Sequence, residues 1–406
     1  MPKIIKDEKL IDEFLERGVA EIFPSKKEFK EKLLTGKRLR VYCGFDPSAP
    51  SLHIGNAILI NKLAQFQKMG HEVIFLIGDF TGMIGDPTDK AATRKKLTRE
   101  EVEKNAKSYK KLASAYLDFS ENNPAEVKYN SKWNDKLTFK DLIEVASNFT
   151  VQNMIQRDMF QERLKAEKPI YLHEFLYPLA QGYDSLVMDV DVEIGGNDQM
   201  FNMLCGRDLM KAVSKKEKFV LTMKLLADEN GKKMGKSEGN VVWLDDAPTD
   251  MFGKVMSWPD GVIGIGFELC TNLEFDRVKK IYKDLKNPKI NPRDMKIELA
   301  YELTKINYGE RKALEAREYF EKVISNKELP TEIAEIKIAN EDELIEVLVE
   351  NKLASSKADA RRKIEQGGVK IDNEAVSDWQ LKLDEKFSGK IIKVGKREFR
   401  KIKITK

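Results

Sequence analysis

A turn rich in glycine and proline, placed between an apolar run and a helical stretch, constrains the fold of this chain most strongly. Residues 39–43 are the apolar run, residues 44–56 form the turn, and residues 57–69 have helical spacing. A second apolar run, residues 73–77, ends at Gly78. Short apolar runs that end in glycine fit buried parallel strands, so the segment predicts a βαβ unit in an open α/β sheet. Ligands of such sheets bind beyond the carboxyl ends of the strands.

The turn after the first strand has the features of a phosphate site. The first N–H groups of the following helix point at one spot, which favours an anion there. Gly44 allows a backbone to approach a ligand closely, and His53 can donate to a phosphate oxygen. We expect Gly55 to let a nucleotide base lie against the helix, and Asn56 to offer its amide to a ribose.

A second, basic loop lies far along the chain. Lys233 and Lys236 are separated by Met234 and Gly235. The negative charge of a pyrophosphate leaving group grows in the transition state, and mobile lysines that reach it only then lower the barrier. A solvated run of charges is the alternative interpretation. Together the two motifs predict an enzyme that handles nucleotide phosphates.

Composition limits the class of protein. The chain has 406 residues, 41% of them apolar and 34% charged, which fits a protein of two or three domains with real cores. No window approaches 18 uninterrupted apolar residues, and the first residues lack the apolar core of a secretory signal, so we expect a cytoplasmic location and no membrane contact. The three cysteines have no CxxC spacing and histidines are few, so no protein-bound metal is predicted.

Charge and periodicity divide the chain. Residues 357–406 contain 15 Lys or Arg against 8 Asp or Glu, although the whole chain carries only +4. Such a basic end suggests a polyanionic partner, with a solvated lysine-rich surface as the alternative. Apolar periodicity predicts helices over residues 8–35, 99–120, 138–168 and 273–325. Residues 326–340 are polar and are the best linker.

The motifs resemble those of a known family. His53-Ile-Gly-Asn56 and Lys233-Met-Gly-Lys-Ser237 are similar to the two signatures of class I aminoacyl-tRNA synthetases. With residues 42–55, 177–184 and 195–199 they resemble the bacterial tyrosyl-tRNA synthetases over nearly the whole chain. The resemblance implies activation of L-tyrosine by ATP, with Mg²⁺ arriving on the ATP, and transfer of tyrosine to the 3′ end of tRNA(Tyr). Three positions depart from the family: Asn56 replaces a usual histidine, Asn197 a threonine or serine, and Gly235 a serine.

The resemblance also implies an organisation into domains. A Rossmann-type catalytic domain with a doubly wound parallel sheet would span residues 1–245, with connective helices inserted at about 120–170. A helical anticodon-recognition domain would span 246–330, a linker 331–340, and a small α+β S4-like RNA-binding domain 341–406. The family is homodimeric, so a homodimer is expected.

Carried over position by position, the resemblance assigns roles to individual residues. Tyr42 and Asp184 would bind the substrate phenol; Asp86, Tyr177 and Gln181 the α-ammonium; and Gln199 the carboxylate. The ATP set would comprise Gly44, Asp46, His53, Gly55, Asn56, Gly196, Asp198, Lys233, Met234, Lys236 and Ser237, with Gly196 and Asp198 at the ribose. Ser48 and His53 would contact the transferring phosphate, and Lys90, Arg94, Lys233 and Lys236 would surround the pyrophosphate. Phenylalanine would leave Tyr42 and Asp184 unpaired, which predicts its rejection.

The last segment resembles an S4 RNA-binding module. Ser355 or Ser356 can cap a helix, and Gly367 with Gly368 can end it before a short strand. The cations of this helix would meet phosphates of structured RNA. They are Lys357, Arg361, Arg362 and Lys363.

Three other functions fit parts of the sequence. A class I synthetase for tryptophan would share the signatures, but an indole gives no reason for the pair Tyr42 and Asp184. A nucleotidyltransferase on the same sheet would not need the S4-like tail. A non-enzymatic RNA-binding protein would not need His53 and the lysines of the second loop.

Overall fold

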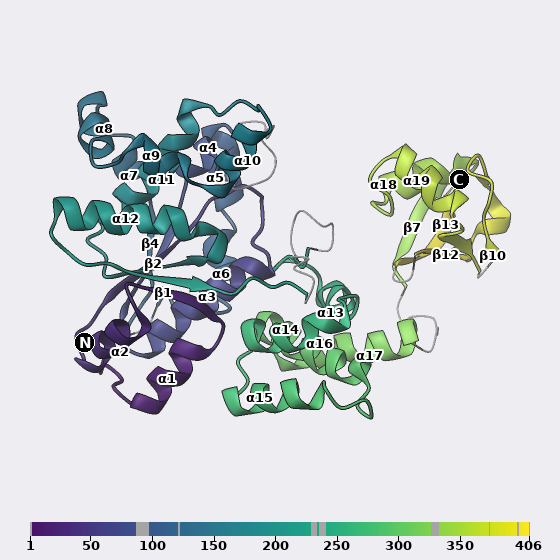
Figure 1. Ribbon diagram of the computed structural model, residues 1–406. Coiled ribbons are helices and arrows are strands. Elements are labelled where there is room, and N and C mark those ends of the chain that lie inside the picture. The colour runs from purple at the N-terminus through teal and green to yellow at the C-terminus, as the bar shows by residue number, and fades with distance from the viewer. Residues whose placement is uncertain are drawn as a thin grey trace. The chain divides into compact units, whose positions relative to one another are not determined.

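The computed structural model describes the chain except residues 1, 87–96, 121, 229–233, 235–240, 326–332, 373, 396–397 and 406, and the side chains of 323–325. The chain divides into two compact units, Met1–Ala313 and Leu314–Lys406 (Figure 1). In the described part of the chain, no helix is both long and apolar enough to cross a membrane.

A six-stranded sheet organises the first unit. Its strand order is β1(Val19–Phe23), β6(Phe219–Met223), β5(Val192–Gly196), β2(Arg40–Phe45), β3(Glu72–Ile77), β4(Glu126–Tyr129). All neighbours are parallel except β1 and β6. After β2 the chain adds β3 and β4 on one side and later β5 on the other, so the order reverses at β2. The predicted doubly wound α/β fold is confirmed, and such a reversal opens a crevice at the carboxyl end of β2.

Helices cover both faces of this sheet, which explains its nearly continuous apolar strands. On one face α3(Ile54–Lys68) lies with α1(Glu8–Glu16) and α2(Lys26–Leu34), and on the other lie α11(Leu172–Val187) and α12(Met200–Val213) (Figure 1). Alternate residues of β2 serve the two faces: Tyr42 packs among Met188, Val190 and Met210 on the α11 side. The backbones of α11 and α12 approach closely at Gly182 and Gly206, where an added Cβ would meet the other helix at 3.3 Å.

The predicted helix over residues 8–35 is wrong, because two helices flank a strand there. Gly18 has φ +69° and ends the first helical stretch, and Ser25 caps α2 by accepting from the Glu28 N–H. Between them β1 pairs antiparallel with β6 at the sheet edge. The helices predicted over 99–120 and 138–168 occur as several short ones, including α5(Arg99–Ala106), α8(Phe139–Ala146), α9(Val151–Ile155) and α10(Asp158–Lys165).

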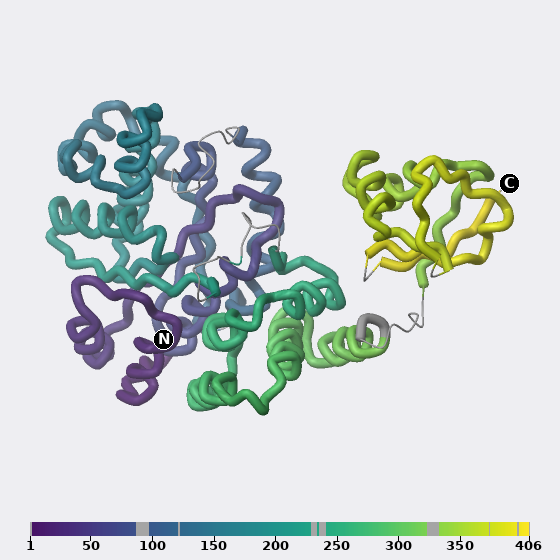
Figure 2. Tube along the Cα trace, turned by 45° about the vertical axis from the view of Figure 1, so that its right-hand side comes forward, coloured from purple at the N-terminus to yellow at the C-terminus, as the bar shows by residue number. Residues whose placement is uncertain are grey.

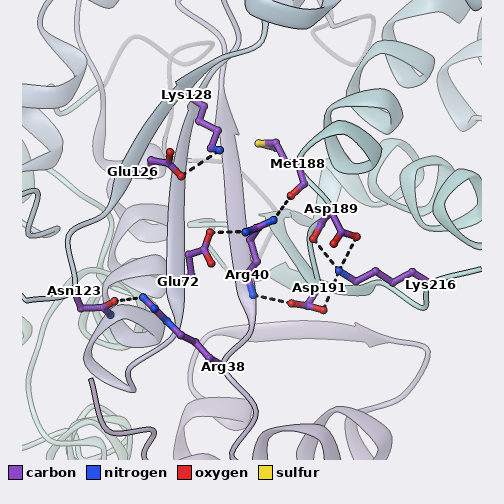
Figure 3. A network of polar contacts seen from close by, with 10 residues as sticks. All are labelled: Arg38, Arg40, Glu72, Asn123, Glu126, Lys128, Met188, Asp189, Asp191 and Lys216. Atoms are coloured by element: carbon purple, nitrogen blue, oxygen red, sulfur yellow. Dashed lines mark hydrogen bonds and ion pairs between the residues drawn. The ribbon is translucent and has the colours of Figure 1, made fainter. Parts of the chain in front are cut away.

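A polar network joins the amino ends of the central strands (Figure 3). Arg40 donates from Nε to Glu72 Oε1 at 2.6 Å and from Nη1 to the Met188 carbonyl at 2.9 Å. Asp191 accepts from the Arg40 N–H at 2.8 Å and pairs with Lys216 at 3.1 Å. These bonds tie β2 to β3 and to the start of β5, so they hold the strands in register at the end away from the crevice.

Helices complete the first unit after residue 246. They are α13(Pro248–Met256), α14(Ile263–Cys270), α15(Phe275–Asp284), α16(Pro292–Tyr308) and α17(Glu310–Tyr319), which continues into the second unit. Arg17 fastens this group to the sheet region, because its guanidinium donates to the carbonyls of Glu268, Thr271 and Leu273 at the end of α14. Carbonyls at a helix end have no partner within the helix, so Arg17 satisfies them.

The second unit is a small α+β domain. Its sheet has the order β10(Glu374–Ala375), β9(Val369–Ile371), β12(Ile391–Val394), β13(Glu398–Thr405), β7(Glu335–Ala339). Helices α18(Leu344–Glu350) and α19(Lys357–Glu365) share its apolar core, and Figure 2 follows the trace from green to yellow. Residues 335–339 of the predicted linker form strand β7 and pair parallel with β13, because Ile336 and Ile338 are buried in this core.

Candidate active site

A cavity of about 500 Å³ opens at the carboxyl ends of β2, β3 and β5, where the strand order reverses. Its walls come from the turn after β2, the start of α3, the segment after β3, helix α11, and the end of β5. Most of the site residues predicted from the sequence line it: Tyr42, Gly44, Asp46, Ser48, Asn56, Asp86, Tyr177, Gln181, Asp184, Gly196, Asp198 and Gln199. His53, Gly55 and Met234 lie outside this lining.

Asp184 is the best-supported carboxylate of the cavity. Trp133 Nε1 and Asn134 Nδ2 donate to its Oδ1 at 2.7 and 2.9 Å, and Asn130 Nδ2 donates to its Oδ2 at 3.0 Å. Burial raises the pKa of Asp184 to about 7, while these three donors act in the opposite direction. Above that pH the group is an anion that accepts hydrogen bonds and faces the cavity.

Tyr42 lies at the bottom of the same cavity. Its hydroxyl is 2.7 Å from Ser185 Oγ, and either oxygen could be the donor. Burial raises the pKa of Tyr42 well above its usual value, and the carboxylates of Glu193 and Asp184 add to this. The hydroxyl therefore keeps its proton at neutral pH and can donate it.

The polar groups expected at the α-ammonium are fixed by hydrogen bonds to neighbouring side chains of the cavity. The Tyr177 hydroxyl donates to Asp46 Oδ2 at 2.8 Å, and the Thr81 hydroxyl donates to Asp46 Oδ1 at 2.6 Å. Gln199 donates its amide to Asp86. A Cβ at Gly78 would come within 1.9 Å of Asp46, so glycine is needed there to admit this carboxylate.

Arg157 supports Asp86 from outside the cavity lining. Its guanidinium is 3.6 Å from Asp86 Oδ1 and lies over the rings of Phe160 and Phe201. Burial lowers the pKa of Arg157, with the Asp86 charge opposing this. The arginine thus brings a positive charge to the back of the carboxylate expected to bind an ammonium.

The first signature caps helix α3. The Gly55 N–H donates to His53 Nδ1 at 3.1 Å, and the His53 N–H donates to Asn56 Oδ1 at 3.0 Å. Since Nδ1 accepts, a neutral His53 carries its proton on Nε2 and is a donor there. A Cβ at Gly55 would approach the His53 ring at 2.9 Å. Glycine at this position therefore makes room for the histidine, a reason not foreseen from the sequence.

The second signature falls largely outside the described residues. Its residues Lys233, Lys236 and Ser237 are not among the described ones, and neither are Lys90 and Arg94, which were predicted to lie at the same pyrophosphate. Met234 is buried, and its N–H donates to the Leu226 carbonyl at 2.8 Å.

The segment after this signature touches the first one. Ile54 N–H donates to the Val242 carbonyl at 2.9 Å, and the rings of His53 and Trp243 meet edge to face. Val242 and Trp243, which follow the second signature in the sequence, therefore lie directly beside the first signature.

Sequence reasoning missed the side chains that contact the predicted site residues, directly or, for Lys218, through Glu193 and Ser185. They are Thr81, Asn130, Trp133, Asn134, Arg157, Ser185, Glu193 and Lys218. A signal existed for three of them: residues 130–134 follow β4 immediately, at the same edge of the sheet as the other strand ends.

Of the cations predicted to bind RNA, Lys357, Arg361 and Arg362 are exposed in the second unit and Lys363 is half-buried. Ala360 and Ile364 turn one face of α19 into the core. Each cation has an acidic partner within the unit: Lys357 pairs with Glu346, Arg361 with Glu365, and Arg362 and Lys363 both pair with Asp359. Exposed pairs of this kind are weak, about 0–1 kcal/mol, so a phosphate can compete with them.

Comparison with known proteins identifies the family of this chain. Residues 34–325 match the family described as tRNA synthetases class I (W and Y), and residues 325–402 match the tyrosine–tRNA ligase SYY-like C-terminal domain. The chain is 42% identical over 389 residues to a tyrosine–tRNA ligase of Thermotoga maritima, covering 96% of each chain. It is 42% identical over 393 residues to that of Haemophilus influenzae, covering 97% of this chain and 96% of the other.

Solved structures share the fold. The tyrosyl-tRNA synthetase of Archaeoglobus fulgidus in complex with L-tyrosine has a TM-score of 0.61 at 22% identity, covering 76% of this chain and all of the other. The truncated mitochondrial tyrosyl-tRNA synthetase of Aspergillus nidulans has a TM-score of 0.65 at 22% identity, covering 76% and 92%. The chain therefore belongs to the class I tRNA synthetases of the W and Y family, and within it resembles the tyrosine–tRNA ligases over nearly its whole length.

Proposed function

We propose that the chain is a tyrosine–tRNA ligase, which activates L-tyrosine with ATP and transfers it to tRNA(Tyr). The single observation that carries the proposal is the environment of Asp184. An anion held by three donors in a cavity that also contains the Tyr42 hydroxyl is a receptor for a phenol, which both donates and accepts. A phenyl side chain would leave both groups without partners, at a cost of about 1–3 kcal/mol for each buried group. An indole can donate its N–H to Asp184 but accepts nothing, so it would leave the Tyr42 hydroxyl without a partner.

The remaining roles follow from the chemistry of the cavity. We assign the substrate ammonium to Asp86, Tyr177 and Gln181, and its carboxylate to the neighbourhood of Gln199. The carboxylate of tyrosine is the nucleophile and attacks the α-phosphorus of ATP, so no side chain needs to form a covalent bond. Positioning and stabilisation of charge then supply the rate.

The nucleotide belongs at the turn after β2 and the end of β5. Gly44, Asp46, Gly55 and Asn56 would line its path, Gly196 and Asp198 its ribose, and Ser48 and His53 the reacting phosphate. His53 Nε2 is a donor in the neutral ring, which suits an anionic oxygen. Lys90, Arg94, Lys233, Lys236 and Ser237, with the Met234 main chain between them, would complete the pyrophosphate site.

Magnesium would arrive with ATP. Within the described residues, no group of three or more His, Cys, Asp or Glu side chains is placed to hold a metal ion. Mg²⁺ commonly keeps several waters and binds phosphate oxygens, with few protein ligands. The ligands of Mg²⁺ would then be phosphate oxygens of ATP and water, and the ion would neutralise the phosphates.

We further propose that the protein acts as a homodimer. Phe139 and Leu172 are 77% and 83% exposed, and Ile143 and Val151 are also exposed. Beside them an apolar groove of about 380 Å³ is lined by Leu142, Leu176 and Leu179, among others. A two-fold interface needs one surface that complements itself. Protruding apolar side chains and an apolar groove on the same helices provide that complement for a second copy.

The second unit would bind tRNA. Its exposed cations on α19 suit phosphates, and the guanidinium of Arg361 lies over the Trp379 ring at 4.7 Å. We propose the catalytic domain at residues 1–245 and the anticodon-recognition helices at 246–330. A cytoplasmic location is consistent with Cys43, Cys205 and Cys270, which are free and buried.

Amino-acid-dependent exchange of pyrophosphate into ATP tests the proposal with the purified chain. Exchange with tyrosine, but with neither tryptophan nor phenylalanine, is expected. Exchange driven by tryptophan, or none with tyrosine, would contradict it.

A further inference from the structure

A buried ion pair lies at the cavity, whose lining includes Glu193, and it takes no part in the roles assigned above. Lys218, just before β6, has 0% of its side chain exposed, and Glu193 in β5 has 2%. Charges are costly to bury unless they are paired and fully hydrogen-bonded. Glycine at position 206 makes the space, because a Cβ there would lie 2.5 Å from Lys218 Nζ. An uncommon arrangement of this cost calls for a physical reason.

The pair occupies both oxygens of Glu193. Lys218 bonds Oε2, and Gln181 Nε2 donates to Oε1 at 2.9 Å. Because a carboxylate only accepts, Gln181 must turn its NH₂ group toward Glu193. Its carbonyl oxygen is then oriented away from that carboxylate, as binding of a substrate ammonium requires.

The same ion pair influences the direction of the hydrogen bonds made by the hydroxyls of Ser185 and Tyr42. Ser185 Oγ accepts from Lys218 Nζ at 2.9 Å, lies 2.7 Å from the Tyr42 hydroxyl, and is 3.3 Å from Glu193 Oε2. A serine has one proton to donate. Two acceptors compete for it: Glu193 Oε2 at 3.3 Å, to which Lys218 already donates, and the oxygen of Tyr42 at 2.7 Å. The bond from Lys218 weakens the pull of Glu193, so the nearer oxygen of Tyr42 is the favoured acceptor. Tyr42 then keeps its own proton for the cavity.

We infer that Lys218 is a positioning residue for substrate selectivity, which orders a chain of hydrogen bonds from Lys218 through Ser185 and Tyr42 to the substrate phenol and on to Asp184. In this order Tyr42 donates to the phenol oxygen and Asp184 accepts the phenol proton. Without Lys218, Glu193 draws the Ser185 proton and Tyr42 donates back to Ser185. The cavity would then present two acceptors to a phenol that has one proton. The inference rests on the proposed function.

A double-mutant comparison tests it. The variants are Lys218→Met, Tyr42→Phe and the pair together, and the readout is kcat/KM for tyrosine relative to phenylalanine in pyrophosphate exchange. Loss of one neutral hydrogen bond to the substrate corresponds to roughly 3- to 10-fold. We expect each single variant to lower the ratio by that amount, and the double variant to lower it no further than Tyr42→Phe alone.

The control is Lys216→Met, which removes a lysine two positions away that pairs with Asp189 and Asp191 outside the cavity. It should leave the ratio unchanged. If Lys218→Met does not fold, Lys218→Gln replaces it, because a neutral amide binds the Glu193 carboxylate more weakly than the ammonium does; its ratio should fall in the same direction, by less.

The outcomes separate this inference from the proposed function. Suppose that the wild-type chain does exchange with tyrosine. Two results would then overturn the role of Lys218: a double variant whose loss equals the product of the two single losses, or an unchanged ratio in both Lys218 variants. Absence of tyrosine-dependent exchange in the wild-type chain would instead remove the proposed function on which the inference stands.

Discussion

The indole Nε1 of Trp133 donates to Asp184 Oδ1 across 2.7 Å, and so connects the segment after β4 to helix α11 at the centre of the cavity. The bond is the shortest of the three that hold this carboxylate. A donor to a charged acceptor is worth about 1.5–3 kcal/mol, more than a neutral pair.

Trp133→Phe keeps the ring and removes this donor. We expect kcat/KM for tyrosine in pyrophosphate exchange to fall about 10-fold, the lower end of that range. The pKa of Asp184 should rise further, because one of the bonds that favour the anion is lost. A variant with wild-type kcat/KM and an unshifted pH profile would show that the indole N–H does not support the carboxylate.

Activation of tyrosine should depend on pH through Asp184. Its pKa is raised to about 7 by burial, and the anion accepts the phenol proton more strongly than the neutral carboxyl, whose O–H is itself a donor. As pH falls through 7 the carboxyl becomes protonated, so kcat/KM for tyrosine should approach a tenfold loss per pH unit below that value.

The pH profile for ATP provides the control. Measured at saturating tyrosine, kcat/KM for ATP should not show this decline, since tyrosine already occupies the pocket. A flat tyrosine profile between pH 6 and 8, or the same decline in both profiles, would exclude Asp184 as the titrating group.

The sequence predicted the part of the fold that local signals determine. The strands expected to end at Gly44 and Gly78, and the helix between them, were predicted from apolar runs and glycines that lie within the segment itself. Strand β1 was missed because its evidence is not local: Val19–Phe23 becomes a strand by pairing with β6, some 200 residues later. Its apolar residues alone fit a helix equally well.

The site shows the same division. Tyr42 and Asp184, which line the cavity, were predicted because they lie in motifs. Their partners were missed because each contact joins distant segments: Asn130 reaches Asp184 across 54 positions, and Lys218 reaches Glu193 across 25. In the sequence Glu193 is simply one polar position in an alternating strand. Only the contacts of α11 with β5 show that Glu193 is buried and lies at the cavity.

A charge placed on the exposed apolar surface should separate the proposed dimer. Leu172→Glu would bury a carboxylate in the interface, and sedimentation velocity should then show a monomer where the wild-type chain shows a dimer. Val213→Glu is the matched control, because Val213 is 52% exposed at the end of α12, a helix that carries neither the protruding side chains named above nor any residue of the groove lining. Dimers in both variants, or a monomeric wild-type chain, would contradict the assignment of this surface.

Removal of the second unit should separate activation from transfer. The truncation is best placed after residue 325, because a cut at 340 would leave strand β7 without its partner β13. Pyrophosphate exchange should stay within about twofold of the full chain, since every described residue of the cavity precedes the cut.

Charging of tRNA should fall at least about tenfold in the truncated chain, as contacts with phosphates are lost. In the full chain, replacing Lys357, Arg361, Arg362 and Lys363 by alanine should cause a smaller loss and weaken the dependence of charging on salt, because fewer phosphates are neutralised. A truncated chain that charges tRNA at the full rate would show that the second unit does not bind tRNA. Unchanged salt dependence in the alanine variant would instead place its phosphate contacts on other residues of the unit.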